Sequence, residues 1–463
     1  MKHVVVEREE GGTSLQEDTA PASASPVQTR LRPADWLLVF AVFAVCFAGA
    51  VMVPSVFCPD EGARQLLSDW IYSTGTLPTG NEPETIVEGY EFSYALRPYL
   101  SAIIAALFMR IVSFATTDPH ALLVASRMVS VLSVVACCVF CLKLGALLFR
   151  ERSSAWLLAI FVCFLPQVVF LGMYQNNDAL SLAAVCAIAY CLVKCHDACW
   201  SVRSCVALGV ALSVGLLSYY TIYGWLLVGG LFCIVSILRD DRVEDRGRLV
   251  AKRAALVIGI CLVLAGWFFV RNAMLHEGDF LGLASEARQR AAREAMGFEL
   301  AEMPSMRDEG YSPWGFFLYA DYYWIRLTAM SFVGVFGGMD IVMPKLLYDA
   351  YYYPVALGIV LYLVAVVRHR PCARDRLLVL AMLLAVCITF GLHFWTSYTR
   401  DFQPQGRYVI SMALLLGYMV AYGLENLSET LARRGLHPAV AFSALWIALF
   451  VISATTTMSR MLQ

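Results

Sequence analysis

The sequence predicts an all-α, polytopic integral membrane protein that crosses the bilayer about eleven times, within a range of about nine to thirteen. Hydrophobic residues make up 59% of the 463 residues and charged residues only 15%, and the mean hydropathy of +0.65 is above that of soluble domains. Apolar runs of about 20 residues, the length that spans a hydrocarbon core, recur along the chain. Clusters of Lys and Arg follow alternate runs, and because such clusters stay in the cytoplasm they set the direction of each crossing.

The chain divides into a polar amino-terminal tail and a single membrane domain. Residues 1–32 are rich in Ser, Thr, Pro, Ala and Glu and lack apolar periodicity, which is typical of a disordered cytoplasmic tail rather than a signal peptide. Residues 33–463 are expected to form one transmembrane domain. Its first apolar run, Trp36 to Phe57, leads outward, so we expect a multi-pass protein of the plasma membrane with a cytoplasmic amino terminus. The net charge of −1 indicates no nucleic-acid partner.

Residues 58–96 form the first extracytoplasmic loop, and its composition is acidic. We expect a short amphipathic helix on the membrane surface here, because apolar side chains recur at helical spacing. These side chains are Leu66, Leu67, Trp70 and Ile71. Arg64 follows Asp60 by four residues and Glu61 by three, so these three side chains would share the opposite face of this helix.

The later apolar runs show where the chain turns. Residues 204–238 are too long for one span, so we expect two short spans with a break at residues 218–224. Residues 97–115 and 331–343 are expected to be interfacial, because counting either as a span would reverse the charge rule downstream. Residues 271–348 form the large extracytoplasmic loop, whose Tyr and Trp residues fit an aromatic belt at the headgroup level.

Asp60 and Glu61 follow the first crossing directly and allow two interpretations. In the structural one they begin the next helix, where the positive end of the helix dipole favours carboxylates. In the catalytic one, a carboxylate acts as a general base and its neighbour as an electrostatic partner at the boundary between lipid and water. Polar groups at the ends of other runs favour the catalytic interpretation, because they fall on the same side of the membrane.

Acids, amides and arginines gather on this extracytoplasmic side. They are Asn177, Asp178, Arg271, Asn272, Asp279, Gln405 and Arg407. Arginine suits phosphate because its planar guanidinium forms paired, charge-assisted hydrogen bonds, and a carboxylate beside it can deprotonate a hydroxyl. Each group also has a structural interpretation: Asn177 and Asp178 can cap a helix, and Arg271 and Arg407 can anchor spans at the interface.

Five segments, taken in order, resemble an uncharacterised family of bacterial membrane proteins similar to the GT-C glycosyltransferases, which include protein O-mannosyltransferases and lipid A aminoarabinose transferases. The segments are Pro59 to Glu61, Tyr174 to Asp178, Gly266 to Asp279, Ser331 to Gly337 and Gln405 to Tyr408. The resemblance covers most of residues 36–424 and implies a GT-C-like fold and a polyprenyl-phosphate sugar donor. It also implies that Asp60 is the base, with Glu61 beside it.

The chain departs from this family pattern at two places. Arg64 replaces an expected His, in the manner of the aminoarabinose transferases, and suits phosphate. Tyr, Tyr and Thr occupy residues 219–221, where a Lys is expected. The missing Lys leaves Arg271, Arg407 and Lys345 as candidates for binding the donor phosphate, with Tyr408 beside them.

The sequence therefore predicts a membrane glycosyltransferase that moves a sugar from a polyprenyl-phosphate carrier to an acceptor hydroxyl on an envelope glycan, lipid or protein outside the cell. The alternative is a transporter or flippase of lipid-linked saccharides, a class that usually places charges at mid-membrane and contains internal repeats. A non-catalytic envelope protein is a third possibility, in which Asp60 and Glu61 would tolerate substitution.

No cofactor is certain from the sequence, and a divalent cation remains possible. The grouped residues Cys195, His196, Cys199 and Cys205 have a spacing that fits no zinc pattern. No metal ligand can therefore be named.

The predicted orientation can be tested with fused reporters. A reporter after Arg246 should be cytoplasmic, because the basic loop around it obeys the positive-inside rule, and one inserted near Ser305 should be outside. Paired alkaline phosphatase and fluorescent-protein fusions measure both positions. The reverse pattern would place the polar groups in the cytoplasm and remove the argument for an extracytoplasmic site.

Overall fold

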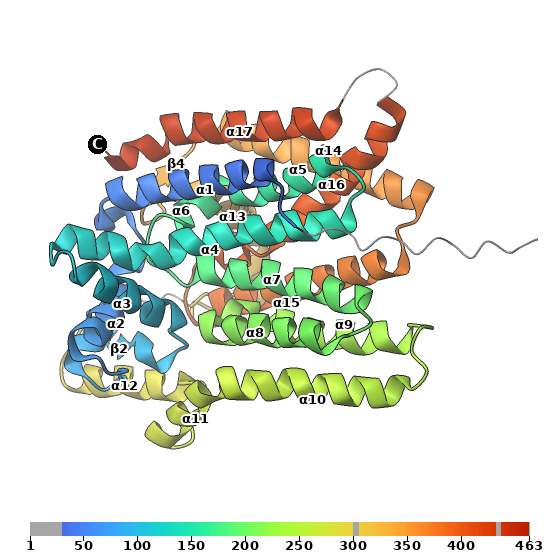
Figure 1. Cartoon of the computed structure of the whole chain (residues 1–463). Coiled ribbons are helices and arrows are strands. Elements are labelled where there is room, and N and C mark those ends of the chain that lie inside the picture. Colours follow the sequence, from blue (N-terminus) through green and yellow to red (C-terminus); the bar gives the residue numbers. More distant parts are fainter. Residues whose placement is uncertain (1–29, 300–304, 432–436, 463) are drawn as a thin grey trace, which may run out of the picture.

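The computed structural model describes residues 30–299, 305–431 and 437–462. Its long helices lie side by side in a bundle, and shorter helices gather at one end (Figure 1). Among the described residues, seven helices are long and apolar enough to cross a membrane, or eight when α10 (Arg246–Leu264) and α11 (Gly266–Leu275), which are bent by 52°, count as one span. These findings confirm an all-α polytopic membrane fold, whereas the count of eleven crossings stays a prediction.

The described helices fall into three groups by composition and place. The candidate membrane spans are α1 (Pro33–Met52), α4 (Pro119–Leu148), α7 (Asp178–Asp197), α9 (Tyr223–Leu238) with the turn η4 (Tyr220–Ile222) before it, α14 (Lys345–His369), α15 (Ala373–Thr399) and α17 (Pro438–Thr456). Other apolar helices are α3 (Leu100–Ser113), α5 (Arg152–Cys163), α6 (Pro166–Leu171), α8 (Val202–Ser218) and α16 (Met412–Leu431). The helices α2 (Glu61–Thr74), α12 (Leu283–Ala295) and α13 (Pro313–Gly334) belong to the predicted outer loops.

Two short antiparallel ribbons complete the predicted outer end. One pairs β1 (Ile86–Val87) with β2 (Phe92–Ser93), and the other pairs β3 (Val335–Phe336) with β4 (Ile341–Val342). The second ribbon lies within residues 331–343, and no spanning helix forms there, as expected. The break predicted in the 204–238 run is also confirmed, because α8 ends at Ser218 and α9 begins at Tyr223.

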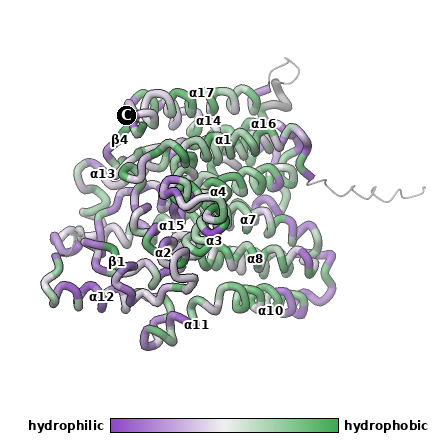
Figure 2. Tube along the Cα trace, turned by 60° about the vertical axis from the view of Figure 1, so that its left-hand side comes forward, coloured by the Kyte–Doolittle hydropathy of each residue, from purple (hydrophilic) through white to green (hydrophobic). Residues whose placement is uncertain are grey.

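The hydrophobic core is built around α7, whose apolar residues surround the whole helix. A helix that is hydrophobic on every side must be covered by other elements, and α4 and α8 pack closely against it. By contrast, α14 is mostly exposed along its length. Hydrophobic residues fill the middle of the molecule and hydrophilic ones mark its two ends (Figure 2).

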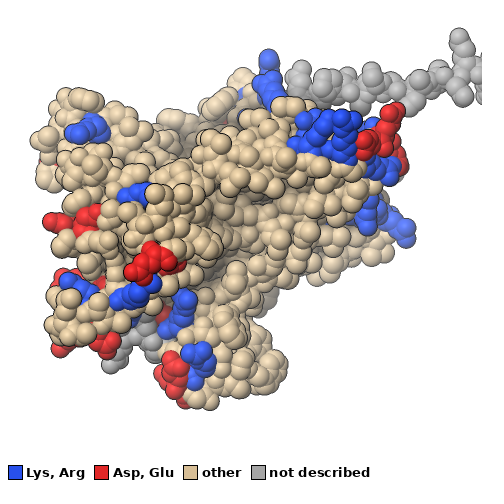
Figure 3. Space-filling model, turned by 90° about the horizontal axis from the view of Figure 1, so that it is seen from below, with Lys and Arg blue, Asp and Glu red and all other residues tan. Residues whose placement is uncertain are grey.

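Charged residues are unequally distributed between the two ends. On the face shown in Figure 3, Lys and Arg gather at the right-hand end, where α1 begins, and mixed acidic and basic residues occupy the opposite end. This is the asymmetry from which the orientation was predicted.

Two expectations for the first outer loop need correction. The first helix ends at Met52 rather than at Phe57, because Pro54 cannot continue it and a 3-10 turn, η1 (Ser55–Phe57), follows. The helix α2 forms as predicted, but it begins at Glu61, so Asp60 stands before it and does not share a helix face with Glu61 and Arg64, which are both packed inward. A buried ion pair to Glu61, described below, makes this packing possible.

Glycine allows two of the predicted spans to approach closely. A Cβ on Gly423 of α16 would lie 2.6 Å from the backbone nitrogen of Tyr362 in α14. Replacing Gly423 with Ala should therefore destabilise the protein by about 1–3 kcal/mol, the usual cost of overpacking. The matched control is Gly230→Ala in α9, where a Cβ meets nothing within 4 Å. Thermal unfolding midpoints in detergent compare the two, and equal midpoints would contradict the close packing.

Candidate active site

Asp60 stands between η1 and α2 in a left-handed backbone conformation, with φ at 59°. This conformation is uncommon for a residue other than glycine and has to be held by its surroundings. Although Asp60 occupies the N-cap position of α2, its side chain does not cap the helix. Its Oδ2 instead accepts a hydrogen bond from Nη2 of Arg407 at 2.6 Å. The geometry thus disagrees with the interpretation of Asp60 as a helix cap.

Arg407 is presented by a second 3-10 turn, η5 (Gly406–Val409), which follows α15. Glycine is needed at position 406, because a Cβ there would lie 2.1 Å from the backbone nitrogen of Phe332 in α13. The Gly406 N–H also donates to the Ser331 hydroxyl. These contacts fix the turn against α13, so the buried Arg407 guanidinium reaches Asp60 from the other end of the chain.

The charge state of Asp60 follows from these neighbours. Burial alone would raise its pKa, but the guanidinium groups of Arg407 and Arg64 outweigh burial and hold the pKa below its usual value. Asp60 is therefore ionised at neutral pH. Its side chain remains 29% exposed, so a substrate hydroxyl can reach the carboxylate.

Arg64 lies beside this pair in an aromatic setting. Its guanidinium carbon is 4.0 Å from the ring centroid of Tyr94 and 5.8 Å from that of Tyr219. The side chain is buried, and its Nη1 has no hydrogen-bond partner among the described residues. Within the same part of the chain, no carboxylate lies at ion-pair distance from Arg64. Arg64 is thus a buried cation whose charge is not directly compensated.

Arg97 approaches the same tyrosine from another side. Its guanidinium carbon is 5.3 Å from the Tyr94 ring centroid, and Glu286 of α12 pairs with it at 2.6 Å. The Tyr219 ring is in turn 6.4 Å from that of Tyr408, whose hydroxyl accepts a hydrogen bond from Arg407. The structure therefore surrounds the Asp60–Arg407 pair with tyrosine rings and two further cations.

Asn177 and Asp178 lie where α7 begins. The helix is capped by their neighbour Asn176, whose Oδ1 accepts from the Ala179 N–H at 2.8 Å. Asn177 accepts a hydrogen bond from the Ser101 hydroxyl. Asp178 is buried and within electrostatic range of Arg407, Arg64 and Asp60. The structure thus brings Asp178 close to Asp60, Arg64 and Arg407, and these four residues together with Arg97 form the charged cluster.

Four predicted substrate-binding residues have other surroundings. Arg271 donates to the Leu77 carbonyl at 2.9 Å, Asn272 donates to the Leu96 carbonyl, and Asp279 accepts from the Ser285 N–H. The first two bonds join α11 to the first outer loop, and the third joins α12 to the turn that precedes it. Lys345 is exposed where α14 begins. Among the described residues, its side chain forms no hydrogen bond to the charged cluster.

Gln405 and Tyr408 flank Arg407 in the chain. The backbone N–H of Gln405 donates to the Gln403 carbonyl, and the Tyr408 hydroxyl donates to the side-chain oxygen of Gln403. Tyr408 is thereby held beside the Arg407 guanidinium, whose carbon is 5.1 Å from its ring centroid.

Several residues around Asp60 were not anticipated from the sequence. Tyr94, Arg97 and Tyr219 carry no spacing signal that sets them apart. Arg127 does carry one, because a lone Arg inside an apolar run is costly and needs a partner. That partner is Glu61, whose carboxylate receives Arg127 through two hydrogen bonds of 2.8 and 2.6 Å.

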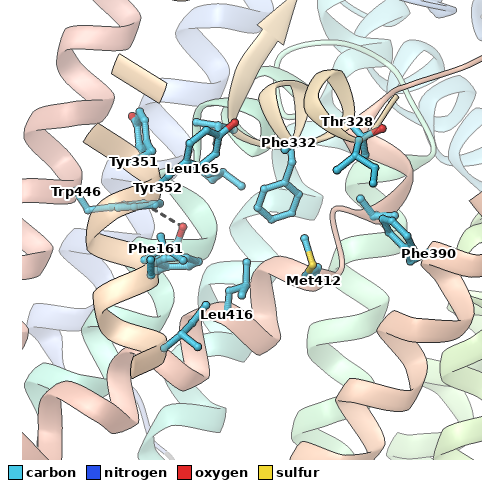
Figure 4. A pocket seen from close by; sticks show the side chains of 17 residues that line it. Phe161, Leu165, Thr328, Phe332, Tyr351, Tyr352, Phe390, Met412, Leu416 and Trp446 are labelled. Carbon is cyan, nitrogen blue, oxygen red and sulfur yellow. Dashed lines mark hydrogen bonds between the residues drawn. The ribbon is translucent and has the colours of Figure 1, made fainter. Parts of the chain in front are cut away.

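An apolar cavity of about 410 Å³ lies next to η5 (Figure 4). Val409, two residues after Arg407, is part of its wall. The labelled side chains come from several helices: Phe161, Leu165, Thr328, Phe332, Tyr351, Tyr352, Phe390, Met412, Leu416 and Trp446. Two further lining residues, Ala329 of α13 and Ala356 of α14, are exposed at the protein surface. The cavity therefore opens sideways, between the helices of the bundle.

The described residues contain no group of three or more His, Cys, Asp or Glu side chains placed to hold a metal ion. A requirement for a divalent cation stays an untested prediction.

The fold is GT-C-like, because it is similar to the folds of two solved structures of that type. The structure is similar to that of ArnT from Cupriavidus metallidurans bound to undecaprenyl phosphate, with a TM-score of 0.55 and 13% identity over 91% of this chain and 77% of that one. It is also similar to the archaeal oligosaccharyltransferase AglB from Archaeoglobus fulgidus in complex with an inhibitory peptide and a dolichol-phosphate. There the TM-score is 0.51 and the identity 12%, over 92% of this chain and 55% of AglB. At such low identity these likenesses define the fold alone.

Residues 90–416 match the family described as "Predicted membrane protein (DUF2142)", and the chain belongs to this family. No curated protein is similar enough in sequence to count as a match. The resemblance inferred from the five sequence segments is thus confirmed at the level of family and fold.

The electrostatic account of Asp60 can be tested directly. Replacing Arg407 with Gln removes the charge that contributes most to lowering the Asp60 pKa, while burial still raises it, so the pKa should rise. Infrared titration of the carboxyl band, identified by its loss in Asp60→Asn, measures the shift. Arg407→Lys keeps the charge and should keep the pKa low. An unchanged pKa in the Gln variant would contradict the pairing.

Proposed function

We propose that the protein is a glycosyltransferase that moves a sugar from a polyprenyl-phosphate carrier to an acceptor hydroxyl on the extracytoplasmic side of the membrane. The observation that carries this proposal is the ionised, partly exposed Asp60 beside Arg407 and the buried Arg64, whose Nη1 has no hydrogen-bond partner among the described residues. A base for a hydroxyl and cations for a phosphate are thereby placed within one cluster.

The charge on Arg64 supports an anionic ligand. The charge of Arg407 is already balanced by Asp60, whereas Arg64 is buried, has an unpartnered Nη1 and has no carboxylate at ion-pair distance in the described part of the chain. A buried, unsatisfied donor on a cation is costly unless a ligand supplies the acceptor. A phosphate oxygen meets this need, and guanidinium groups suit phosphate through paired hydrogen bonds.

The reaction can be written with the residues that the structure brings together. The acceptor oxygen forms a bond to the anomeric carbon of the sugar while the bond from that carbon to the phosphate oxygen breaks. Asp60 takes the proton of the acceptor hydroxyl. The carrier phosphate leaves with one more negative charge, which Arg64 and Arg407 stabilise because they are fixed in a site of low dielectric.

Arg407 can serve two anions in turn. When the donor phosphate enters, it competes with Asp60 for the same guanidinium. A weaker bond from Arg407 to Asp60 raises the pKa of Asp60 towards the value of a better base. Binding of the donor would then prepare Asp60 for its role.

The apolar cavity beside η5 suits the hydrocarbon chain of the carrier. It has an almost entirely hydrophobic wall, opens at the side of the bundle and lies next to the turn that bears Arg407. A ligand with a charged head at the cluster and an apolar chain in the membrane fits both features. A soluble nucleotide sugar has no use for such a cavity.

The proposed role of Asp60 gives a clear expectation. Asp60→Asn keeps the size of the side chain but removes the proton acceptor, so transfer should fall by about 10²- to 10⁴-fold. The measurement is transfer of labelled sugar in proteoliposomes, from a panel of undecaprenyl-phosphate-linked hexoses and pentoses to extracted envelope acceptors.

The control is Asp69→Asn, a change of the same kind at an exposed position in α2. It should transfer sugar at the wild-type rate. Normal transfer by Asp60→Asn would remove Asp60 from the reaction. If the wild-type protein moved lipid-linked saccharide across the vesicle membrane without transfer, the transporter alternative would replace the enzyme.

A further inference from the structure

Arg127 lies in α4, within an otherwise apolar stretch, and is completely buried. All of its donor nitrogens have partners. Nε and Nη2 bind the two carboxylate oxygens of Glu61, and Nη2 also reaches the Ser55 hydroxyl at 3.1 Å. A bidentate pair with every donor satisfied has a defined geometry, in contrast to an exposed ion pair.

The remaining guanidinium nitrogen of Arg127, Nη1, binds the end of the first helix. Nη1 donates to the carbonyls of Ala50 and Val53, at 2.8 and 2.7 Å. These carbonyls belong to the last turn of α1 and its cap, where backbone acceptors have no partner within the helix. Arg127 therefore fixes where α1 ends and the path of the chain towards Asp60.

Glu61 joins a third segment to the same point. Its Oε1 also accepts the backbone N–H of Gln175 at 2.9 Å. Gln175 is three residues before Asp178, which lies in the charged cluster. One buried pair thus connects α4 with the turn before α2 and the turn before α7, and each of these turns carries a carboxylate of the candidate site.

The backbone at Asp60 explains why such an anchor is needed. Asp60 has a left-handed conformation that an Asp does not adopt readily by itself. Its side chain is held by Arg407 on one side, and its main chain is continuous with Glu61 on the other. When a substrate draws Arg407 away, the anchor at Glu61 still holds the main chain next to the Asp60 carboxylate.

We infer that Arg127, through the buried pair with Glu61, is a positioning residue that sets the place of the Asp60 carboxylate during the reaction. This inference rests on the proposed function, because the displacement matters only if Asp60 acts on a substrate. It assigns Glu61 to the anchor rather than to the reacting atoms, in contrast to the catalytic role expected from the sequence. Stability alone does not account for the pair, since apolar residues often replace a buried pair without loss.

The test uses a double variant, Arg127→Met with Glu61→Gln, which removes both charges and keeps an acceptor for the Gln175 N–H. We expect kcat for sugar transfer to fall by about 10²-fold, the effect of a misplacement of about 1 Å, while KM for the undecaprenyl-phosphate-linked donor stays within about twofold. The matched control is Asp35→Asn with Arg152→Met, an ion pair with a buried carboxylate at the opposite end of α1 that should leave kcat unchanged.

A single variant keeps the inference testable if the double variant does not fold. Glu61→Asp retains the charge and shortens the side chain by one methylene, so it should fold, pull the turn towards α4 and lower kcat with little change in KM. A folded protein with kcat within twofold of wild type, in either variant, would overturn the positioning role.

The Asp60→Asn variant separates the two proposals. If it transfers sugar normally, the proposed function fails for Asp60 whatever the pair variants do. If it is inactive while the pair variants keep their kcat, the positioning role alone is wrong. An equal loss of kcat in the Asp35 and Arg152 control would overturn the positioning role, because the effect would then not depend on the pair next to Asp60.

Discussion

The contact between Asp60 and Arg407 joins residues 347 positions apart and holds the candidate site together. Each partner depends on an unusual piece of backbone: a left-handed turn before α2 for Asp60, and a glycine pressed against α13 for Arg407. Neither turn would be stable as an isolated segment. Their meeting requires α1 and α15 to end on the same side of the bundle, at a membrane surface, because charged turns cannot stay in hydrocarbon.

A buried charge in such a protein needs a partner, and the described part of the chain supplies most of them. Glu61 has Arg127, and Asp35 has Arg152 at the opposite end of α1. Arg64 differs, because it is stacked on Tyr94 and lacks a carboxylate at ion-pair distance. A buried cation that lacks a carboxylate at ion-pair distance, in a cluster next to an apolar cavity, suits a ligand with an anionic head and an apolar chain. A lipid phosphate has this chemistry.

Much of the architecture follows from the order of apolar and basic residues. The break between α8 and α9 was predictable, since 35 apolar residues are too many for one crossing, and so was the helix α2. The extent of α1 was not, because hydropathy continues past Pro54 although the helix ends at Met52. The inward face of α2 was also missed, because its burial depends on Arg127, a residue 66 positions from Glu61.

The sequence by itself determined the class of the protein, the segments that end on one side and the identity of Asp60, Asp178 and Arg407 as candidates. Hydropathy and charge act locally along the chain, so these features are readable without a fold. Only the tertiary structure separated Asp60 from Glu61. Adjacent residues where a helix begins point about 100° apart, and the partner that each one meets, Arg407 or Arg127, comes from a distant segment whose place is decided by packing.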